Sequence, residues 1–310
     1  MGPWLVRVPP WRHPPPMDLT LDRRLDRTTE GWLSGLLGVV IFSGSLPATR
    51  VAVLDLSPLL LTSARAVIAA LIGAACLLLL RQVRPARRDL PSLAIVATGV
   101  VLGFPLLTGL ALRHITAAHS IVFVGLLPMA TAMFGVLRGG ERPRPAFWAF
   151  AGIGAAAVAG FALLTSGQGE LEGDLLMLAA IVLCGLGYAE GATLSRRLGG
   201  WQVISWALVL AAPVMALLGV VSAHRPTDGV SPAAWLGLGY VTVFSMFLGF
   251  VFWYRGLALG GIAGVGQLQL LQPFLGLLLA GLLLGEPVAP GMVLATAVVV
   301  LCVVGARRTA

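Results

Sequence analysis

Charged side chains are scarce in this sequence, and lysine is absent altogether. Only 11% of the 310 residues are charged, 58% are hydrophobic, and the mean hydropathy is +0.93. A soluble domain of this length needs far more polar surface. The composition therefore excludes a soluble enzyme and indicates a chain that is solvated mainly by lipid. It leaves a membrane-embedded enzyme open.

Motifs that would hold a metal, a cofactor or ATP are also missing. The three cysteines, Cys76, Cys184 and Cys302, lie inside apolar runs and are too scattered for a disulfide framework or a metal site. The sequence contains no HExxH motif, no Walker lysine and no Ser/His/Asp set, so we expect neither a cofactor nor a metal. Without a soluble domain to bind ATP, primary pumping would need a separate subunit.

Ten apolar segments reach the length of about 20 residues that a helix needs to cross a bilayer. We predict transmembrane helices at roughly 31–52, 57–80, 91–112, 116–137, 146–165, 174–195, 202–221, 233–254, 261–284 and 291–306. The connections are short, which leaves no room for a second, soluble domain. The expected fold class is an all-α integral membrane protein of ten helices.

The formal net charge of +8 comes from arginines that are gathered at the ends of these segments. If the spans alternate strictly, twelve arginines lie on one side and only Arg50, Arg113 and Arg225 on the other. Arginine-rich loops stay in the cytoplasm, so we expect both termini there, in a bacterial-type inner membrane. Such clusters orient helices, and no nucleic-acid partner is expected.

Residues 1–30 precede the first apolar segment. Their opening, MGPWLVRVPPWRHPPP, is rich in proline and has no apolar core long enough for a signal peptide. We expect a disordered cytoplasmic tail at 1–30 and a short cytoplasmic C-terminus at 307–310. Met17 offers a more ordinary start, and the sequence leaves the choice between Met1 and Met17 open.

Two segments 145 residues apart share a pattern of proline, glycine and glutamate. Aligning LLPMATAMFGVLRGGERPRP with LLQPFLGLLLAGLLLGEPVAP places Pro128 on Pro273 and Glu141 on Glu286. These residue types are not apolar filler, so we infer an internal repeat of about five spans. An odd number of spans inverts the second half in the membrane, which is a common plan of secondary transporters.

The chain resembles drug/metabolite transporters of the EamA type from Gly31 to Arg308. The resemblance is carried by SPLLLTSARAVIAAL, by ALRHITAAHSIVFVGLLPMATAMFGVLRGGERP and by LQPFLGLLLAGLLLGEP. The chain departs from a symmetric pattern at Ala258, which stands where the first half has Arg113. The resemblance implies two five-helix repeats, 31–165 and 174–306, around a central cavity, with the fifth and tenth helices outside it. Members of this family carry amino acids, other metabolites or drugs, often outward.

Three ionisable residues lie well inside predicted spans, where a charge is costly unless it faces protein or water. Glu190 would bind a cationic group or take up a proton, or else pair with Arg197 two turns away. Arg65 would bind a carboxylate or phosphate, but a structural bond to backbone carbonyls is the favoured interpretation. His119 would relay protons or serve as a neutral packing residue.

The ninth span begins GIAGVGQLQLLQP and places Gln269 and Gln272 on one helical face. Amide side chains at this depth bind a polar ligand or tie helices together. Pro273 frees a backbone carbonyl one turn earlier, and with Pro128 it marks a helix break or hinge. Tyr188 would stack on a substrate, although aromatic residues in such helices more often serve packing.

The stretch GIGAAAVAG, residues 152–160, resembles a dinucleotide loop, but no strand precedes it. Gly152, Ala156 and Gly160 instead predict a small-residue packing face, and Gly281 and Gly285 are interpreted in the same way.

Together these patterns predict a secondary transporter that exports a small polar or amphipathic metabolite by alternating access. Glu190 is the first candidate for the substrate or proton partner, and Gln269 and Gln272 are the polar wall. The expected partners are the lipid bilayer, a small-molecule substrate, protons and a second copy of the chain. An antiporter of phosphorylated or nucleotide-linked sugars would need several cavity bases, where only Arg65 is available. A lipid-modifying enzyme would need a His, Asp or Glu cluster, and a scaffold would need no buried glutamate.

Overall fold

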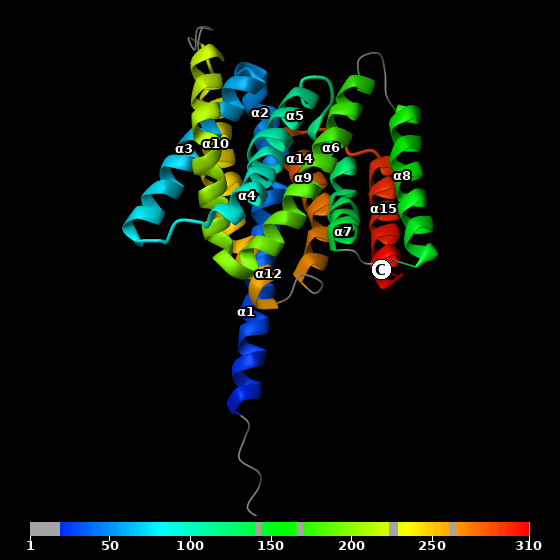
Figure 1. Ribbon diagram of the computed structural model, residues 1–310. Helices are drawn as coiled ribbons and strands as arrows, with labels where there is room; N and C mark the ends of the chain where they lie inside the picture. Colours follow the sequence, from blue (N-terminus) through cyan, green and yellow to red (C-terminus); the bar gives the residue numbers. More distant parts are fainter. Residues whose placement is uncertain (1–18, 140–143, 166–169, 223–228, 261–264, 310) are drawn as a thin grey trace, which may run out of the picture.

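The computed structural model describes residues 19–139, 144–165, 170–222, 229–260 and 265–309, and these ranges contain helices and connections but no strand. Figure 1 shows a bundle of roughly parallel helices. The start of α1 projects beyond one end of the bundle, and the C-terminus of α15 lies toward that same end. The all-helical architecture expected from the sequence is confirmed over these residues.

Helices of the first half are interrupted at several points. Helix α1 (Leu19–Ser43) continues after Gly44 as α2 (Ser45–Asp55), and α3 (Pro58–Leu79) follows. We call a run of consecutive helical segments a rod. The third rod consists of η1 (Arg87–Asp89), α4 (Leu90–Val96), the π-helical η2 (Ala97–Gly103) and α5 (Phe104–Ala111). Helices α6 (Ala117–Val124), α7 (Leu127–Gly139) and α8 (Pro145–Thr165) complete this half.

The second half repeats this order. It begins with α9 (Glu170–Leu198) and α10 (Gly200–Ser222). A third rod joins α11 (Pro232–Gly239), the π-helical η3 (Tyr240–Leu248) and α12 (Gly249–Gly260). The 3₁₀-helical η4 (Gly266–Leu271) leads into α14 (Gln272–Leu284), and α15 (Pro290–Thr309) ends the chain. Both π-helical segments therefore lie in the third rod of their half.

Seven helical stretches of the described residues are long and apolar enough to span a membrane. They are Thr29–Asp55, Pro58–Leu79, Arg87–Ala111, Ala117–Leu137, Glu170–Leu198, Gly200–Ser222 and Pro232–Gly256. Shorter apolar helices cover Trp148–Val158, Leu268–Leu284 and Pro290–Cys302, where the sequence predicts the fifth, ninth and tenth spans. The count of ten spans stays a prediction.

The N-terminal segment differs from the expected disordered tail. Helix α1 begins at Leu19, so residues 19–30 continue the first span as a helix, while residues 1–18 lie outside the described part. The run LTLDRRLDRTTEG contains leucine, arginine and glutamate, which favour helix, and no glycine before its end or proline to stop it. An existing helix extends at little cost because its nucleus is already formed.

Each half packs against the other through pairs of rods. Helix α1 packs on α12, α3 on α10, α6 on α14 and α8 on α15, while α9 packs along α4, η2 and α5. Many leucines face outward, such as Leu79, Leu164 and Leu236, as expected for a protein that is solvated by lipid. Buried polar side chains also meet between the halves, as the hydroxyls of Ser45 and Ser245 do.

Glycines allow the closest of these contacts, but not at the positions expected in α8. A methyl group at Gly99 would overlap the carbonyl oxygen of Leu183, so η2 and α9 touch through their backbones. Among the described residues, and apart from the backbone of α8 itself, no atom lies within 4 Å of a methyl group added at Gly152 or Gly160, so these residues show no packing contact there. Gly285 closes α14 in the left-handed conformation with φ 63°, so its role is that of a helix cap rather than packing.

Candidate functional site

Breaks in the helices shape the centre of the bundle. A turn at Gly125 and Leu126 separates α6 from α7, and η4 precedes α14. Pro128 and Pro273 are each the second residue of the helix that follows, where a missing N–H costs nothing. Pro128 thus follows a turn between two helices, whereas Pro273 lies where a 3₁₀ segment passes directly into α14.

A cavity of about 30 Å³ lies where these segments meet. Its walls are Phe42, Ser45, Leu46, Arg65, Val100, Phe104, Pro105, Leu127, Cys184, Tyr188, Ser245, Met246, Phe250 and Gln272. They come from α1, α2, α3, η2, α5, α7, α9, η3, α12 and α14, and none comes from α8 or α15. Both π-helical segments contribute to the wall, a setting in which π-helical turns often mark function.

Three of the residues singled out from the sequence, Arg65, Tyr188 and Gln272, line this cavity. Arg65 is only 5% exposed, and its Nε has no hydrogen-bond partner. The Oε1 of Gln272 is also buried without a partner. The hydroxyl oxygens of Ser45 in the first half and Ser245 in the second half lie 2.7 Å apart and share a hydrogen bond. The wall thus combines one cation, several neutral polar groups and aromatic rings.

The cavity is small and partly enclosed. A site for a drug-sized ligand measures about 300–1,000 Å³. At about 30 Å³, the central cavity is therefore far smaller than a site for such a ligand. A larger hollow of about 330 Å³ lies between Phe274, Leu278 and Val293, but its apolar wall includes exposed leucines and suits a lipid chain.

Glu190 is buried in α9 but does not line the cavity. It lies two residues beyond Tyr188, which is about 200° around a helix, so the two side chains leave α9 on nearly opposite sides. The alternative pairing with Arg197 is wrong for this structure, because Arg197 donates to Oδ1 of Asp89 instead. Asp89 is buried at the start of the third rod, and only its position beside an apolar run could have indicated this from the sequence.

Gln269 and Gln272 are both buried, and only Gln272 reaches the cavity. The Nε2 of Gln269 has no hydrogen-bond partner. Gln269 belongs to the 3₁₀ segment η4 and Gln272 starts α14, so a change of helix type falls between them. The Gln272 amide lines the cavity, whereas the Gln269 amide is buried outside it.

His119 has a partner that the sequence did not suggest. Its Nε2 lies 2.8 Å from Oδ1 of Asp174, and both side chains are buried. The imidazole packs against Phe161, with ring centroids 4.8 Å apart, and does not line the cavity. Asp174 is the first residue of the sixth predicted span, and only its position beside that apolar run could have marked it.

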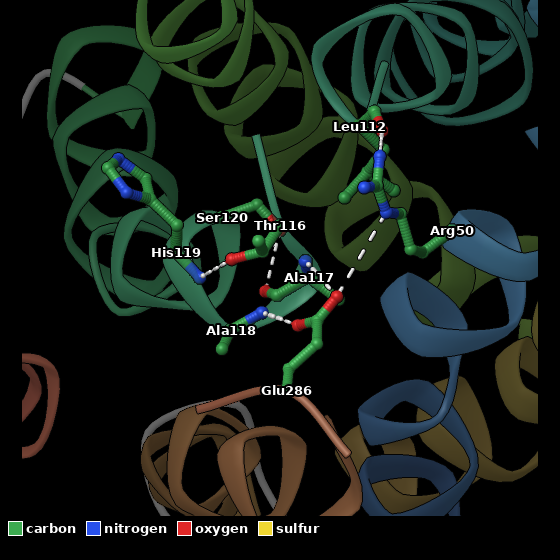
Figure 2. Close-up of polar contacts among 8 residues, drawn as sticks. All are labelled: Arg50, Leu112, Thr116, Ala117, Ala118, His119, Ser120 and Glu286. Atoms are coloured by element: carbon green, nitrogen blue, oxygen red, sulfur yellow. Dashed lines mark hydrogen bonds and ion pairs between the residues drawn. The ribbon is translucent and has the colours of Figure 1, made fainter. Parts of the chain in front are cut away.

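Figure 2 shows a second unpredicted cluster, centred on Glu286. Its carboxylate accepts hydrogen bonds from the backbone N–H groups of Ala117 and Ala118, at 3.1 and 2.8 Å, and so caps the N-terminus of α6. Arg50 lies beside it, with Nε 4.0 Å from Oε1, and donates from Nη1 to the carbonyl of Leu112 at the end of α5. Each charge therefore meets the helix end of opposite polarity. Glu141, the aligned residue of the first half, lies outside the described residues.

Comparison with known proteins identifies relatives over the whole length of the bundle. A sequence model of the EamA-like transporter family matches the chain twice, over residues 29–163 and 171–307. The uncharacterized transporter YdeK of Bacillus subtilis is 60% identical over 286 residues, which cover 92% of this chain and 100% of that protein. A protein named probable terminal-alkyne amino-acid exporter, from Streptantibioticus cattleyicolor, is 25% identical over 262 residues, or 82% and 86% of the two chains.

A solved structure shows the same fold. This crystal structure of a protein 21% identical in sequence superposes with a TM-score of 0.64 and covers 90% of this chain and 97% of its own.

Proposed function

This chain belongs to the EamA-like transporter family and is a multi-pass membrane protein, and on that premise we propose that it is a secondary exporter of a small metabolite. It would work by alternating access around the central cavity, as two inverted repeats at 31–165 and 174–306 that together supply ten spans. Both termini would lie in the cytoplasm, below the inner membrane.

Reciprocal polar contacts between the two halves carry this proposal. Asp89, at the start of the third rod, accepts from Arg197 at the end of α9. Asp55, at the end of α2, accepts from the backbone N–H of Ser231 at 2.9 Å, at the start of the third rod of the second half. The same spacing relates both partners, since 197 − 55 and 231 − 89 each equal 142. In each contact, the end of the first rod of one half meets the start of the third rod of the other half. This equal spacing supports two repeats with the same internal order.

A second pair of contacts follows the same rule. Glu30 near the start of the first span accepts from Arg255 at the end of the eighth. Glu172, near the start of α9, lies 3.9 Å from Nε2 of His114, just after α5. The differences are 172 − 30 = 142 and 255 − 114 = 141. The two successive matches of the family model also support a duplication.

These contacts lie at opposite ends of the proposed spans, and the cavity between them, at about 30 Å³, is far smaller than a site for a drug-sized ligand. In alternating access, contacts at one end must open while those at the other end stay closed. The Glu30–Arg255 and His114–Glu172 pairs are partly exposed, and exposed ion pairs contribute only about 0–1 kcal/mol each, so these two contacts break and re-form readily. The structure thus suits a closed state on the way between two open ones.

Three further parts of the proposal each rest on an observation of their own. Export is proposed as the direction because the Streptantibioticus relative is named as a probable exporter. Glu190 is proposed as a proton partner rather than a cargo contact, because it is buried on the side of α9 away from Tyr188. A homodimer is proposed from the unfilled space beside Gly152 and Gly160 on α8.

Access to the cavity from each side of the membrane can be measured by labelling the thiol of Cys184, because Cys184 lines the cavity. In a Cys76→Ala/Cys302→Ala variant, Cys184 is the only cysteine. We expect a membrane-impermeant maleimide to label it both in intact cells and in inside-out vesicles, since alternating access exposes the cavity to each side in turn. Labelling from one side only, or from neither, would contradict the proposal.

Controls fix the background and the orientation. A variant that also carries Cys184→Ala should show no labelling. Two further variants add a cysteine to this cysteine-free chain at Arg81 or Arg113, both exposed. The cysteine at position 81 should react only in inside-out vesicles and the one at position 113 only in intact cells. The reverse result would overturn the proposed orientation.

A further inference from the structure

Arginines from two distant parts of the chain meet at one end of the bundle. The Nε atom of Arg88, at the start of the third rod, lies 4.0 Å from Oδ1 of Asp89, and Arg197, at the end of α9, donates to the same oxygen. Arg87 and Arg196 are their neighbours in sequence, and all four arginine side chains are exposed. We call these four residues the arginine cluster. Residues 80–90 and 195–199 contain no acidic residue other than Asp89, so four arginines against one aspartate leave a net charge of +3.

The connection from α3 to this cluster combines basic and apolar side chains. Leu80 and Val83 are 60% and 88% exposed, next to the exposed Arg81 and Arg84. In Figure 1 the end of α3 leans away from the bundle, and the connection returns from it to α4. At the boundary between acyl chains and headgroups, an arginine keeps its apolar stem in lipid and its charge among the headgroups. This pattern therefore places the connection at headgroup depth.

An apolar groove runs along the two elements that carry the arginine cluster. It has a volume of about 220 Å³ and is lined by Ala94, Ile95, Thr98, Gly99, Leu183 and Leu186. The first four belong to α4 and η2 and the last two to α9, within the apolar stretches Arg87–Ala111 and Glu170–Leu198. Ala94 and Thr98 are exposed, so this α4–α9 groove lies on the lipid-facing surface of the bundle.

The α4–α9 groove and the arginine cluster share helix faces. Arg88 precedes Ile95 by seven residues and Arg197 follows Leu186 by eleven, which are close to two and three whole helical turns. At a rise of about 1.5 Å per residue, these separations are about 10 and 16 Å. Half of the hydrocarbon core of a bilayer is about 15 Å thick. A phospholipid with its phosphate on the cluster therefore places an acyl chain in the groove.

The charge of the site favours an anionic headgroup. Arginines that only orient helices need no groove beside them. The larger hollow of about 330 Å³ beside α14 and α15 shows the contrast, because no arginine lines it and Glu286 lies next to it. Guanidinium groups donate paired hydrogen bonds to phosphate oxygens. A zwitterionic lipid brings its own cation close to the arginines, whereas phosphatidylglycerol brings one negative charge and no cation.

We propose that this end of the bundle binds an anionic glycerophospholipid of the phosphatidylglycerol class. The lipid phosphate contacts the arginine cluster, and one acyl chain occupies the α4–α9 groove. The bound lipid bridges the third rod of the first half and α9 of the second half, which the contact between Asp89 and Arg197 already joins. This inference depends on neither the direction nor the cargo of transport.

Lipid titration of the full-length protein tests the proposal. The protein is purified in dodecyl maltoside and titrated with dioleoyl phosphatidylglycerol or dioleoyl phosphatidylcholine. Native mass spectrometry measures the dissociation constant of each lipid, and thermal unfolding measures the melting temperature. We expect phosphatidylglycerol to bind roughly 10-fold more tightly and to raise the melting temperature more, because a ligand of the folded state stabilises it. Inorganic phosphate and glycerol 3-phosphate should have no effect at the same concentrations, because they lack acyl chains.

Charge variants test the headgroup contact. Arg87→Gln/Arg196→Gln removes one charge from each element, and the ion pairs of the described residues join Asp89 to Arg88 and Arg197 instead. We expect the dissociation constant of phosphatidylglycerol to rise roughly 30-fold, about fivefold for each arginine. Arg87→Lys/Arg196→Lys keeps both charges and should retain most of the affinity. The matched control, Arg113→Gln/Arg308→Gln, removes two exposed charges elsewhere and should leave binding unchanged.

Space-filling variants test the acyl-chain contact without a change in charge. Ala94→Trp fills the α4–α9 groove and should weaken the binding of phosphatidylglycerol. Leu278→Trp adds the same side chain to the larger hollow and should not. If Ala94→Trp does not fold, Ala94→Leu is the smaller replacement.

The outcomes decide each part separately. Equal affinity for phosphatidylcholine, unchanged affinity in Arg87→Gln/Arg196→Gln, or the same loss in Arg113→Gln/Arg308→Gln would overturn the headgroup assignment. Unchanged affinity when Ala94 is enlarged, or equal stabilisation by glycerol 3-phosphate, would overturn the assignment of the groove. Labelling of Cys184 tests the transport proposal independently, so either proposal can fail while the other stands.

Discussion

The Oε2 atom of Glu286 accepts a hydrogen bond from the backbone N–H of Ala118 at 2.8 Å, across 168 residues of sequence. The glutamate follows α14, and the alanine is in the first turn of α6, so a residue of the second half caps a helix of the first. A carboxylate at a helix N-terminus meets unpaired N–H groups and the positive end of the helix dipole. This contact joins the two halves at one end of the bundle.

Removing this charge should destabilise the protein. Glu286→Gln keeps the shape but loses the charge at the α6 terminus, and we expect a loss of about 1–2 kcal/mol, measured by thermal unfolding in detergent. Glu172→Gln is the matched control, because that side chain is 68% exposed and 3.9 Å from its partner. Equal losses in the two variants would show that the cap contributes nothing special.

The His119–Asp174 pair should behave as one unit. Asp174→Ala leaves the buried imidazole without its partner, and a loss of roughly 3 kcal/mol or more is expected for breaking a buried pair. The double variant His119→Ala/Asp174→Ala should lose less than the sum of the single variants, since the second change no longer breaks a contact. Strict additivity in this cycle would mean that the two residues are not coupled.

Asp89 and Arg197 should contribute unequally although they share one contact. The Asp89 side chain is 3% exposed and also accepts from the N–H of Ala86 at 3.2 Å, whereas Arg197 is 47% exposed. We expect Asp89→Ala to cost about 2–3 kcal/mol and Arg197→Ala less than about 1 kcal/mol. Thermal unfolding of the two variants side by side checks the order, and a larger effect of Arg197→Ala would contradict it.

Two glycines should respond in opposite directions to alanine. At Gly99 a methyl group overlaps the Leu183 carbonyl, so Gly99→Ala must separate η2 from α9 at a cost of about 1–3 kcal/mol. At Gly160 the space is open, and alanine should stabilise α8 by about 0.5–1 kcal/mol. If Gly160→Ala instead destabilises the protein and shifts its oligomeric state in detergent, a second copy packs on α8.

Long-range pairing explains most of what sequence reasoning missed. Asp174 and Glu286 each lie at the edge of an apolar run. A charge at such a position normally faces water, so it does not predict a buried contact. Their partners, His119 and Ala118, are 55 and 168 residues away. Hydropathy and local spacing describe one helix at a time and carry no information on which helix ends meet.

The sequence by itself determined the all-helical architecture and the approximate place of the helices. Apolar runs of spanning length must form helices in lipid, because every backbone polar group needs an internal partner. These are local rules, and they held over the described residues.

Only the tertiary structure decided which polar residues meet. Arg65, Tyr188 and Gln272 line one cavity, whereas Glu190 lies on the other side of α9. Arg197 donates a hydrogen bond to Asp89. The rotation of each helix about its axis is set by packing against its neighbours, and a turn of about 100° per residue moves a side chain from cavity to interface. That choice depends on all the rods at once, so no single stretch of sequence contains it.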